Sequence, residues 1–363
     1  MRGRARCCLT KTTKTDPTHE QYWVALLPAL KVRFFAALLA LLFAGVSTAQ
    51  PLKPEVETFI KLMAERHQFD ASELRQVFHK VRPQPSVVKS TTAPATSKPW
   101  SDFRAIMLTP ERIHGGVKFW NEHAESLARA RAVYGVPEEI ILAILGVETR
   151  YGRLMGGYRV MDALYTNAFE MNLRAEFFRG ELEQFLLLAR DNGYDPLAIK
   201  GSFAGAMGMP QFIPTSYRKH AVDFDGDGKI NLWENADDAI GSVGSYLRDF
   251  GWNVDGLIVV SAQVQTGNLA GLLEKGLKPN TSIAELRALG VEPAQDLPAQ
   301  LTAGLVAYES GGASEYWLSL NNFWVITRYN RSKNYAMSVY QLAREIALER
   351  EKVKWEPSVQ HAE

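Results

Sequence analysis

A helix that is apolar on every face most constrains what this chain can fold into. Pro137, Glu138 and Glu139 open it, because proline suits the first helical position and carboxylates complement the positive end of a helix. The residues that follow, 140–145, are all apolar. A helix of this kind is buried, so we expect it to lie in the interior of the fold.

Glu148 follows this apolar run at the C-terminal end of the predicted helix. Burial and the negative end of the helix both favour the protonated form of its carboxyl group. An acid that keeps its proton near neutral pH is what cleavage of a glycosidic bond requires. A second interpretation stays open from this segment alone, in which Glu148 forms an ion pair with Arg150 or Arg153 at the helix end.

The rest of the chain predicts a mainly helical protein with a small β part. Apolar residues at helical spacing indicate helices in 55–81, in most of 109–250 and in 335–349, and a stretch rich in Pro, Ser and Thr predicts a loop or linker at 82–99. Such a linker could lie inside one domain or between two. Short runs of β-branched and aromatic residues predict strands at 257–264, 305–308, 316–320 and 323–327.

The N-terminal segment has the pattern of a secretory signal peptide. Lys31 and Arg33 precede the apolar run 34–46, and small residues at Ser47 and Ala49 suit cleavage after Ala49. We therefore expect residues 1–49 to be a signal peptide and 50–363 to be one catalytic domain. The alternative is an anchoring helix, although the apolar run is short for a membrane span.

Removal of the signal segment changes both the cysteine count and the charge. Cys7 and Cys8 both precede the cleavage site, so the mature chain would have neither a disulfide nor a thiolate metal site. Its 34 Lys and Arg residues against 38 Asp and Glu residues leave a formal net charge of −4, which disfavours binding to nucleic acid. Gln50, and not cysteine, follows the cleavage site, so no lipid anchor is indicated.

A run of small residues at 201–212 contains Ser202 and Gln211. Small residues let a backbone approach a ligand closely, and the hydroxyl and carboxamide groups can bond sugar hydroxyl and acetamido groups. By itself the run could equally be a tight helix contact or a loop. It is not a phosphate-binding loop, because no Gly-Lys-Ser/Thr follows and no strand precedes it.

Residues 223–234 match the twelve-residue EF-hand loop at every constrained position, including the glycine at its sharp turn. Hard oxygen ligands in this spacing select calcium. EF-hands that act as sensors usually come in pairs, and this loop stands alone. We therefore expect a calcium ion that stabilises the fold, and not one that switches it. Its ligands would be Asp223, Asp225, Asp227, the carbonyl of Lys229, Asn231 and Glu234.

In their order along the chain, four segments together resemble the lytic murein transglycosylase B family. They are Gly146 to Gly152, Gly201 to Gln211, the acidic loop with residues 239–243 after it, and Val325 to Ser332. The resemblance covers about 56–348. It implies an α+β, predominantly α fold, with a lysozyme-like helical body (about 55–250), a small antiparallel sheet (about 253–330), a C-terminal helix and one EF-hand-like calcium loop.

The resemblance also implies roles for individual residues. Glu148 falls on the single catalytic acid and base of the family. Phe177 stands where the family pattern has a tyrosine, so we expect no hydroxyl contact with the substrate at this position. The positions that hold the sugars correspond to Ser202, Gln211 and Asn330, with Arg174, Tyr246, Tyr329 and Tyr335 as further substrate-binding positions.

The family's chemistry implies cleavage of the MurNAc-β-1,4-GlcNAc bond of peptidoglycan without water, giving 1,6-anhydro-MurNAc ends. Calcium would be the only cofactor, and the expected partners are peptidoglycan glycan strands and possible cell-wall synthases or other hydrolases. We expect a soluble monomer in the periplasm of a Gram-negative bacterium. A hydrolytic muramidase and a noncatalytic calcium-dependent wall-binding module remain as alternatives.

Overall fold

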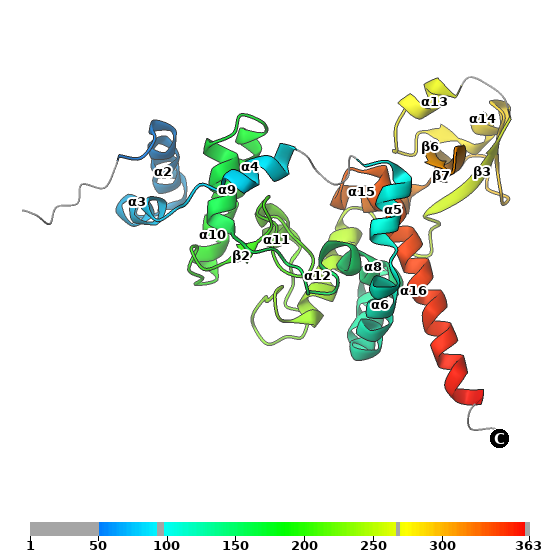
Figure 1. Cartoon of the computed structure of the whole chain (residues 1–363), viewed down its shortest axis with the longest axis horizontal. Coiled ribbons are helices and arrows are strands. Elements are labelled where there is room, and N and C mark those ends of the chain that lie inside the picture. The colour runs from blue at the N-terminus through cyan, green and yellow to red at the C-terminus, as the bar shows by residue number, and fades with distance from the viewer. Residues whose placement is uncertain (1–50, 93–97, 266–268, 360–363) are drawn as a thin grey trace, which may run out of the picture. The chain divides into compact units, whose positions relative to one another are not determined.

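The structure, a computed structural model, describes residues 51–92, 98–265 and 269–359 (Figure 1). The predicted signal peptide, its cleavage site after Ala49, and both cysteines lie outside these residues. From Lys53 onward the chain forms one compact unit, and all contacts described below lie within it. No helix in the part of the chain that is described is long and apolar enough to cross a membrane.

The fold is mostly helical with a small antiparallel sheet in its later part, as the sequence predicted, and it also has a two-stranded antiparallel sheet that was not predicted. Before the first long loop the helices are α2 (Pro54–His67), α3 (Ala71–His79), α4 (Pro85–Thr92), α5 (Trp100–Met107), α6 (Pro110–Glu122), α7 (Ala124–Tyr134) and α8 (Glu138–Thr149). They are followed by β1 (Tyr158–Arg159), α9 (Val160–Phe169), α10 (Ala175–Asp191), β2 (Lys200–Gly201), α11 (Pro214–His220) and α12 (Ala236–Asp249).

The β-rich part follows α12 and contains a five-stranded antiparallel sheet in the order β4-β6-β7-β3-β5. Leu305, Leu318 and Val291 lie in its own hydrophobic core, together with residues of the short helices. Its elements are β3 (Val259–Val264), α13 (Ala270–Glu274), β4 (Thr281–Ser282), α14 (Ile283–Ala288), β5 (Val291–Pro293), β6 (Thr302–Ser310) and β7 (Ala313–Ser319). The chain then returns to helix in α15 (Asn321–Tyr329) and α16 (Lys333–Val359).

Two of the expected elements were wrong. Residues 323–327 form part of helix α15 and not a strand, because a short apolar run fits both structures and only its tertiary packing decides. Residues 85–92 form helix α4 inside the expected loop. Pro85 opens that helix, Val87 is buried, and the Thr91 hydroxyl donates to Asn167 of α9 at 2.9 Å.

Helix α8 lies in the interior of the helical part. Every residue from Ile140 to Val147 is buried, as the apolar sequence predicted, and α6, α7, α12 and α16 pack against this helix. Arg150 takes a left-handed conformation (φ 51°) and ends it. The Arg150 and Tyr151 amides then donate to the carbonyls of Gly146 and Leu145, which satisfies the helix end.

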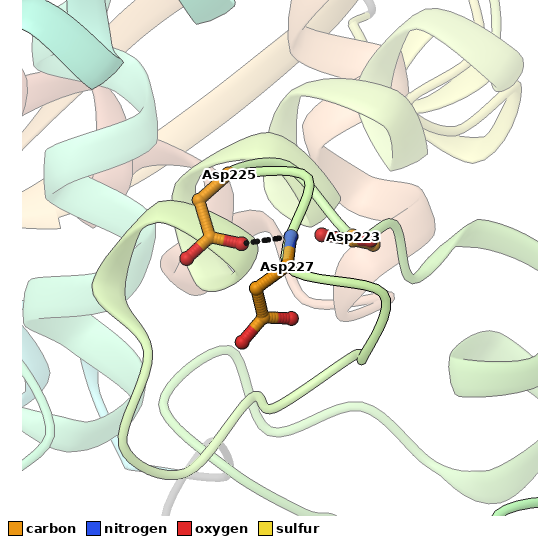
Figure 2. A group of neighbouring side chains, drawn as sticks. All are labelled: Asp223, Asp225 and Asp227. Carbon is orange, nitrogen blue, oxygen red and sulfur yellow. Dashed lines mark hydrogen bonds between the residues drawn. The ribbon is translucent and has the colours of Figure 1, made fainter.

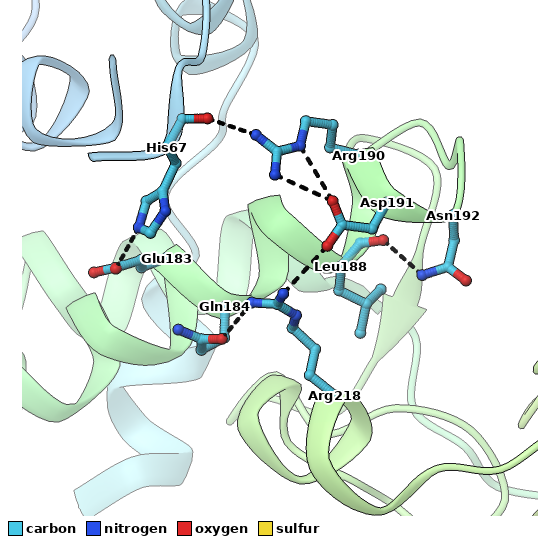
Figure 3. Close-up of polar contacts among 8 residues, drawn as sticks. All are labelled: His67, Glu183, Gln184, Leu188, Arg190, Asp191, Asn192 and Arg218. Atoms are coloured by element: carbon cyan, nitrogen blue, oxygen red, sulfur yellow. Dashed lines mark hydrogen bonds and ion pairs between the residues drawn. The ribbon is translucent and has the colours of Figure 1, made fainter. Parts of the chain in front are cut away.

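Polar contacts hold the N-terminal helices on α10 (Figure 3). The His67 ring, at the end of α2, contacts the Glu183 carboxylate at 2.7 Å, and the Arg190 guanidinium donates to the His67 carbonyl at 2.6 Å. Arg218 of α11 reaches Asp191 at 3.2 Å. These contacts tie α2 and α11 to α10.

Candidate active site

Glu148 lies in the last turn of α8 and is half-buried. Its carboxylate oxygen Oε1 accepts a hydrogen bond from the Tyr335 hydroxyl of α16 at 2.7 Å. The alternative of an ion pair at this helix end is wrong, because Arg150 and Arg153 both contact Glu111, at 3.6 and 3.2 Å. The Glu148 carboxyl group is therefore partnered by a neutral hydroxyl group, and not by a cation.

The surroundings of Glu148 favour its protonated form. Burial raises the pKa of its carboxyl group to about 7, and the hydrogen bond from Tyr335 lowers that pKa by a smaller amount. Burial, with the nearby Glu148 carboxylate as a second cause, raises the pKa of the Tyr335 hydroxyl well above its usual range. Tyr335 therefore remains a donor, and Glu148 can take up and release a proton near neutral pH.

Tyr335, Tyr329 and Tyr246 form a connected cluster of three tyrosines. The Tyr335 and Tyr329 rings are stacked with centroids 6.3 Å apart, and the Tyr329 and Tyr246 rings are 4.7 Å apart. The hydroxyl groups of Tyr329 and Tyr246 donate to the carbonyls of Pro210 (2.6 Å) and Arg328 (2.7 Å). Both hydroxyls are therefore bonded to the backbone, which fixes the two rings; Tyr246 is buried and Tyr329 is half-buried.

The glycine-rich run forms a tight turn next to this cluster. The Ser202 hydroxyl oxygen accepts from the amides of Ala204 (3.2 Å) and Ala206 (3.0 Å), which leaves its own proton free to donate. Gln211 has a left-handed backbone (φ 52°), and its Nε2 donates to the carbonyls of Met155 and Gly208. Its Oε1 has no partner among the described residues and can accept a bond from a ligand.

Two side chains that were not predicted from the sequence hold the C-terminal end of α8, and one of them, Thr149, joins it to the glycine-rich run. The hydroxyl of the buried Thr149 donates to the Met209 carbonyl at 2.8 Å and accepts from the Gly152 amide at 2.9 Å. The buried Arg112 donates through Nε to the Gly146 carbonyl at 2.8 Å. Thr149 could have been predicted from the sequence, because it is a hydroxyl residue directly after Glu148. Arg112 could not, because it lies in an ordinary amphipathic helix.

The two remaining predicted substrate-binding residues, Asn330 and Arg174, differ in whether they lie next to the tyrosine cluster. Asn330 follows Tyr329 at the end of α15, is half-buried, and has no side-chain partner in the described residues. Arg174 is exposed at the start of α10, and its guanidinium lies 4.1 Å from the Phe177 ring centroid. The structure thus places Asn330 beside the tyrosine cluster and shows no contact between Arg174 and that cluster.

The acidic loop brings three of its predicted ligands together. One carboxylate oxygen from each of Asp223, Asp225 and Asp227 lies within 4.8 Å of the others (Figure 2). The two oxygens of Asp223 accept from the amides of Gly226 and Gly228, both at 2.8 Å. These three convergent carboxylates have no basic partner in the part of the chain that the structure describes, and such a group suits a hard divalent cation.

Of the other predicted ligands, Glu234 does not belong to this group. The Asn231 Oδ1 atom accepts from the amides of Trp233 and Glu234, both at 3.1 Å, and the exposed Glu234 carboxylate does not lie within 4.8 Å of all three aspartates. The sequence reasoning also missed Asp238, which is buried and accepts from the amides of Phe224 and Asn231, both at 2.7 Å. Asp238 thereby joins two points of the loop, its second and ninth residues, to α12.

Comparisons with known proteins place this geometry in a family. Residues 51–344 match the family model described as the transglycosylase SLT domain. Membrane-bound lytic murein transglycosylase B of Escherichia coli (strain K12) is 46% identical over 307 residues, which are 82% of this chain and 84% of that protein. Soluble lytic transglycosylase SltB1 from Pseudomonas aeruginosa has a TM-score of 0.77 at 47% identity, covering 82% of this chain and 99% of that one.

Two further solved relatives contain bound groups. Escherichia coli lytic transglycosylase Slt35, in complex with calcium, is 44% identical with a TM-score of 0.75 over 82% of this chain and 94% of that one. SltB3 from Pseudomonas aeruginosa, in complex with NAG-anhNAM-pentapeptide, is 30% identical with a TM-score of 0.70 over 81% of this chain and 79% of that one. Because these matches extend over most of its length, this chain belongs to the lytic murein transglycosylase B family.

Proposed function

We propose that this chain is a peptidoglycan lytic transglycosylase that cleaves the MurNAc-β-1,4-GlcNAc bond without water, with Glu148 as acid and then base. One observation carries the proposal. The Glu148 carboxyl group has a pKa of about 7 and a neutral tyrosine partner, and no other carboxylate of the described residues contributes to that pKa. A group of this kind can donate and accept a proton in one reaction cycle.

The proposed reaction begins with proton transfer from Glu148 to the glycosidic oxygen, and the C1–O bond breaks. The Glu148 carboxylate then takes the proton from the C6 hydroxyl of the muramic acid, and that oxygen attacks C1 to close the 1,6-anhydro ring. Hydrolysing glycosidases use a second carboxylate to activate water or attack the sugar. Here an internal hydroxyl held close to C1 replaces it through its high effective concentration.

Groups with unused hydrogen-bonding capacity support the assignment of sugar-binding residues. The Ser202 hydroxyl proton, the Gln211 Oε1 atom and the Asn330 carboxamide can each bond a sugar hydroxyl or acetamido group. We propose that these three residues bind the sugar. The packed rings of Tyr246, Tyr329 and Tyr335 would form the wall of the site beside it. The exposed Arg174 would contact the substrate farther along the strand.

Analysis of digested peptidoglycan by mass spectrometry tests the proposal. Transglycosylation gives strand ends that are lighter by one water than the reducing ends left by a hydrolytic muramidase. Anhydro ends support the proposal, and reducing ends alone would establish the muramidase. If sacculi stay intact while the protein binds them in a calcium-dependent way, the chain is a wall-binding module.

The pKa of Glu148 predicts how activity depends on pH. The first step needs the protonated carboxyl group, so kcat/KM for soluble glycan strands is expected to fall by about tenfold for each pH unit well above pH 7. Below pH 7 the same group should impose no further loss. Initial rates between pH 5 and pH 9 measure this, and a profile that stays flat up to pH 9 would exclude Glu148 as the acid.

Replacement of Tyr335 by phenylalanine is expected to move the alkaline fall of kcat/KM to higher pH. The Tyr335 hydroxyl lowers the pKa of Glu148 by bonding its charged form, so its loss raises that pKa. Losing one buried hydrogen bond should lower the free energy of unfolding by about 1 kcal/mol. Tyr340→Phe, on the same helix, is the control and should keep the wild-type profile. A shift to lower pH in Tyr335→Phe would contradict the account.

We further propose that the acidic loop binds calcium as a structural ion. Asp223, Asp225 and Asp227 would supply the first carboxylates, and the Lys229 carbonyl, Asn231 and Glu234 would complete the set after rearrangement. The ion would neutralise the loop's charge and supply no step of the reaction. The calcium complex of the relative Slt35 supports this choice of ion.

Removal of calcium is expected to lower the thermal stability of the protein. A ligand present at about 100 times its dissociation constant stabilises the native state by about 2.7 kcal/mol, so chelation should lower the unfolding midpoint by several degrees. Differential scanning calorimetry with chelator and with added calcium measures the shift. Asp225→Asn should abolish most of the response, whereas Asp255→Asn, outside the loop, should retain it. An unchanged midpoint in the wild type would rule out the proposal.

We propose that the protein acts in the periplasm as a monomer without a lipid anchor, on the basis of its N-terminal pattern and of Gln50 at the cleavage site. Its Escherichia coli relative is described as membrane-bound. Cell fractionation tests the difference, since release of the mature protein by osmotic shock is expected and retention in the membrane fraction would contradict it. Contacts with cell-wall synthases or other hydrolases stay a prediction.

A further inference from the structure

A row of contacts joins the segment after Glu148 to the glycine-rich run. The Thr149 hydroxyl donates to the Met209 carbonyl at 2.8 Å, and the Gln211 Nε2 atom donates to the Met155 carbonyl at 3.1 Å. Farther along both segments, strands β1 and β2 pair in antiparallel register. The position of the acid relative to the residues proposed to hold the sugar therefore depends on this row of contacts.

Thr149 makes the contact of this row that lies nearest to the acid in sequence. Its side chain is buried, and its hydroxyl oxygen also accepts from the Gly152 amide at 2.9 Å. The Leu145 carbonyl, at 3.4 Å, is a more distant acceptor for the hydroxyl proton. The backbone carbonyl of Thr149 accepts from the Leu154 amide at 2.9 Å. One residue thus connects the end of α8, the turn that follows it and the glycine-rich run.

The turn that Thr149 closes has an unfavourable backbone conformation. Arg150 (φ 51°), Tyr151 (φ 60°) and Gly152 (φ 85°) are left-handed in succession, and the first two carry a Cβ atom that disfavours this conformation. Such a backbone persists only where the surrounding contacts hold it. On the α6 side, the Tyr151 hydroxyl donates to the Arg112 carbonyl at 2.8 Å. Tyr151 therefore anchors the turn to α6, and Thr149 anchors it to the glycine-rich run.

The glycine-rich run has contacts of its own that do not involve Thr149. The backbone groups of Met207 and Phe212 bond each other in both directions, at 2.8 and 3.0 Å. The Met209 amide donates to the Leu232 carbonyl at 2.7 Å. Loss of the Thr149 hydroxyl should therefore leave the shape of the run intact, and change only where the end of α8 lies relative to it.

We propose that Thr149 is a positioning residue that sets the distance between the Glu148 carboxyl group and a sugar held at Ser202 and Gln211. Proton transfer needs the acid within hydrogen-bonding distance of the glycosidic oxygen, and a displacement of about 1 Å can lower a rate by about 100-fold. Neither bond of the Thr149 hydroxyl involves the Glu148 carboxyl group, so Thr149 acts on geometry and not on acidity. This inference rests on the proposed function and adds to it a buried residue that does not touch the substrate.

Substitutions of Thr149 and of a second buried threonine test the inference. Thr149→Val has nearly the same shape without the hydroxyl, whereas Thr149→Ser keeps the hydroxyl. Thr166→Val is the matched control, because the buried Thr166 hydroxyl also makes two bonds from a helix. It donates to the Asp162 carbonyl at 2.6 Å and accepts from the Gln84 amide at 3.0 Å. For each protein, kcat and KM on soluble glycan strands are measured between pH 5 and pH 9, together with the unfolding midpoint.

Both valine variants should unfold about 2–5 °C below the wild type, since each loses two buried hydrogen bonds. Only Thr149→Val should also lower kcat, by about 10- to 100-fold with KM within about twofold, and Thr149→Ser should restore most of that kcat. The alkaline fall of kcat/KM should stay at its wild-type pH. Equal kcat in the two valine variants, no recovery in Thr149→Ser, or a shifted alkaline fall overturns the inference. If Thr149→Val does not fold, the same comparison is made between Thr149→Ser and Thr149→Ala, which differ only in the hydroxyl.

Failure of this inference is distinguishable from failure of the proposed function. Rates are counted as glycosidic bonds broken, whichever ends form, so the comparison of Thr149→Val with Thr166→Val does not depend on the product. If anhydro ends form at equal rates in the two variants, the positioning inference alone is wrong. If reducing ends form and only Thr149→Val is slow, the positioning inference holds and the reaction is hydrolysis.

Discussion

Replacement of Glu148 by glutamine is expected to lower the rate of anhydro product formation by at least about 10³-fold, because no other described acid stands in for it. Glutamine has nearly the same volume, and its carbonyl oxygen can still accept the Tyr335 hydrogen bond. The loss should therefore fall on kcat and leave substrate binding nearly unchanged. Initial rates on purified sacculi, with products separated by chromatography, measure it.

The matched control for this variant is Glu139→Gln in the first turn of the same helix. Burial also raises the pKa of Glu139, but this residue lies at the opposite end of α8 from Glu148. It should therefore keep wild-type activity. A Glu148→Gln variant that still lysed sacculi at a rate near that of the wild type would show that Glu148 is not the catalytic acid.

The Glu148→Gln substitution should also change how the free energy of unfolding depends on pH. A carboxyl group whose pKa is about 7 in the folded protein and 4.5 in the unfolded chain makes the wild type less stable as pH rises from about 4.5 to 7. Glutamine carries no such charge. As pH rises from 4.5 to 8, the wild type should therefore lose about 1–3 kcal/mol of unfolding free energy relative to Glu148→Gln. Urea denaturation at both pH values measures this.

The second large effect is expected from Gly208→Ala in the glycine-rich run. Gly208 has φ +68°, and an added Cβ would lie 2.5 Å from the backbone carbonyl oxygen of Leu232. The left-handed conformation costs an alanine about 1–2 kcal/mol, and the clash adds about 1–3 kcal/mol. Activity should fall as well, because the Gly208 carbonyl accepts from Gln211 Nε2. Thermal unfolding and initial rates measure both effects.

Gly276→Ala separates the two causes in this prediction. Gly276 has φ +79°, and an added Cβ there would meet no atom within 4 Å. Its substitution should cost about 1–2 kcal/mol for the backbone conformation alone, and activity should be unchanged. If Gly208→Ala were no less stable than Gly276→Ala, the run would not be held against the acidic loop as described.

The parts of the fold that depend on local pattern could be predicted from the sequence. The burial of α8 follows from its continuous apolar run, and its beginning follows from Pro137 and the two glutamates after it. The strand at 323–327 was wrong, and α4 was missed. In both segments, contacts with distant helices select the structure, and a single sequence does not display those contacts.

In the candidate site too, features that depend on local sequence could be predicted, and features that depend on contacts between distant segments could not. The three aspartates of the acidic loop are close in sequence, so their convergence followed from spacing. The hydrogen bond between Tyr335 and Glu148 joins residues on α16 and α8, and only the packing of these two helices brings them together. Asp238 and Arg112 were missed for a related reason, because each bonds backbone groups of another segment without any recognisable motif.

The central claim is that Glu148 completes the reaction with a hydroxyl group of the substrate and without water. Digestion of purified peptidoglycan in water enriched in ¹⁸O, followed by mass spectrometry of the strand ends, tests it most directly. The account predicts 1,6-anhydro ends that contain no ¹⁸O, formed by the wild type and lost in Glu148→Gln. Reducing ends in excess of those present before digestion would contradict it, because only attack by water at C1 leaves a new free hydroxyl group there.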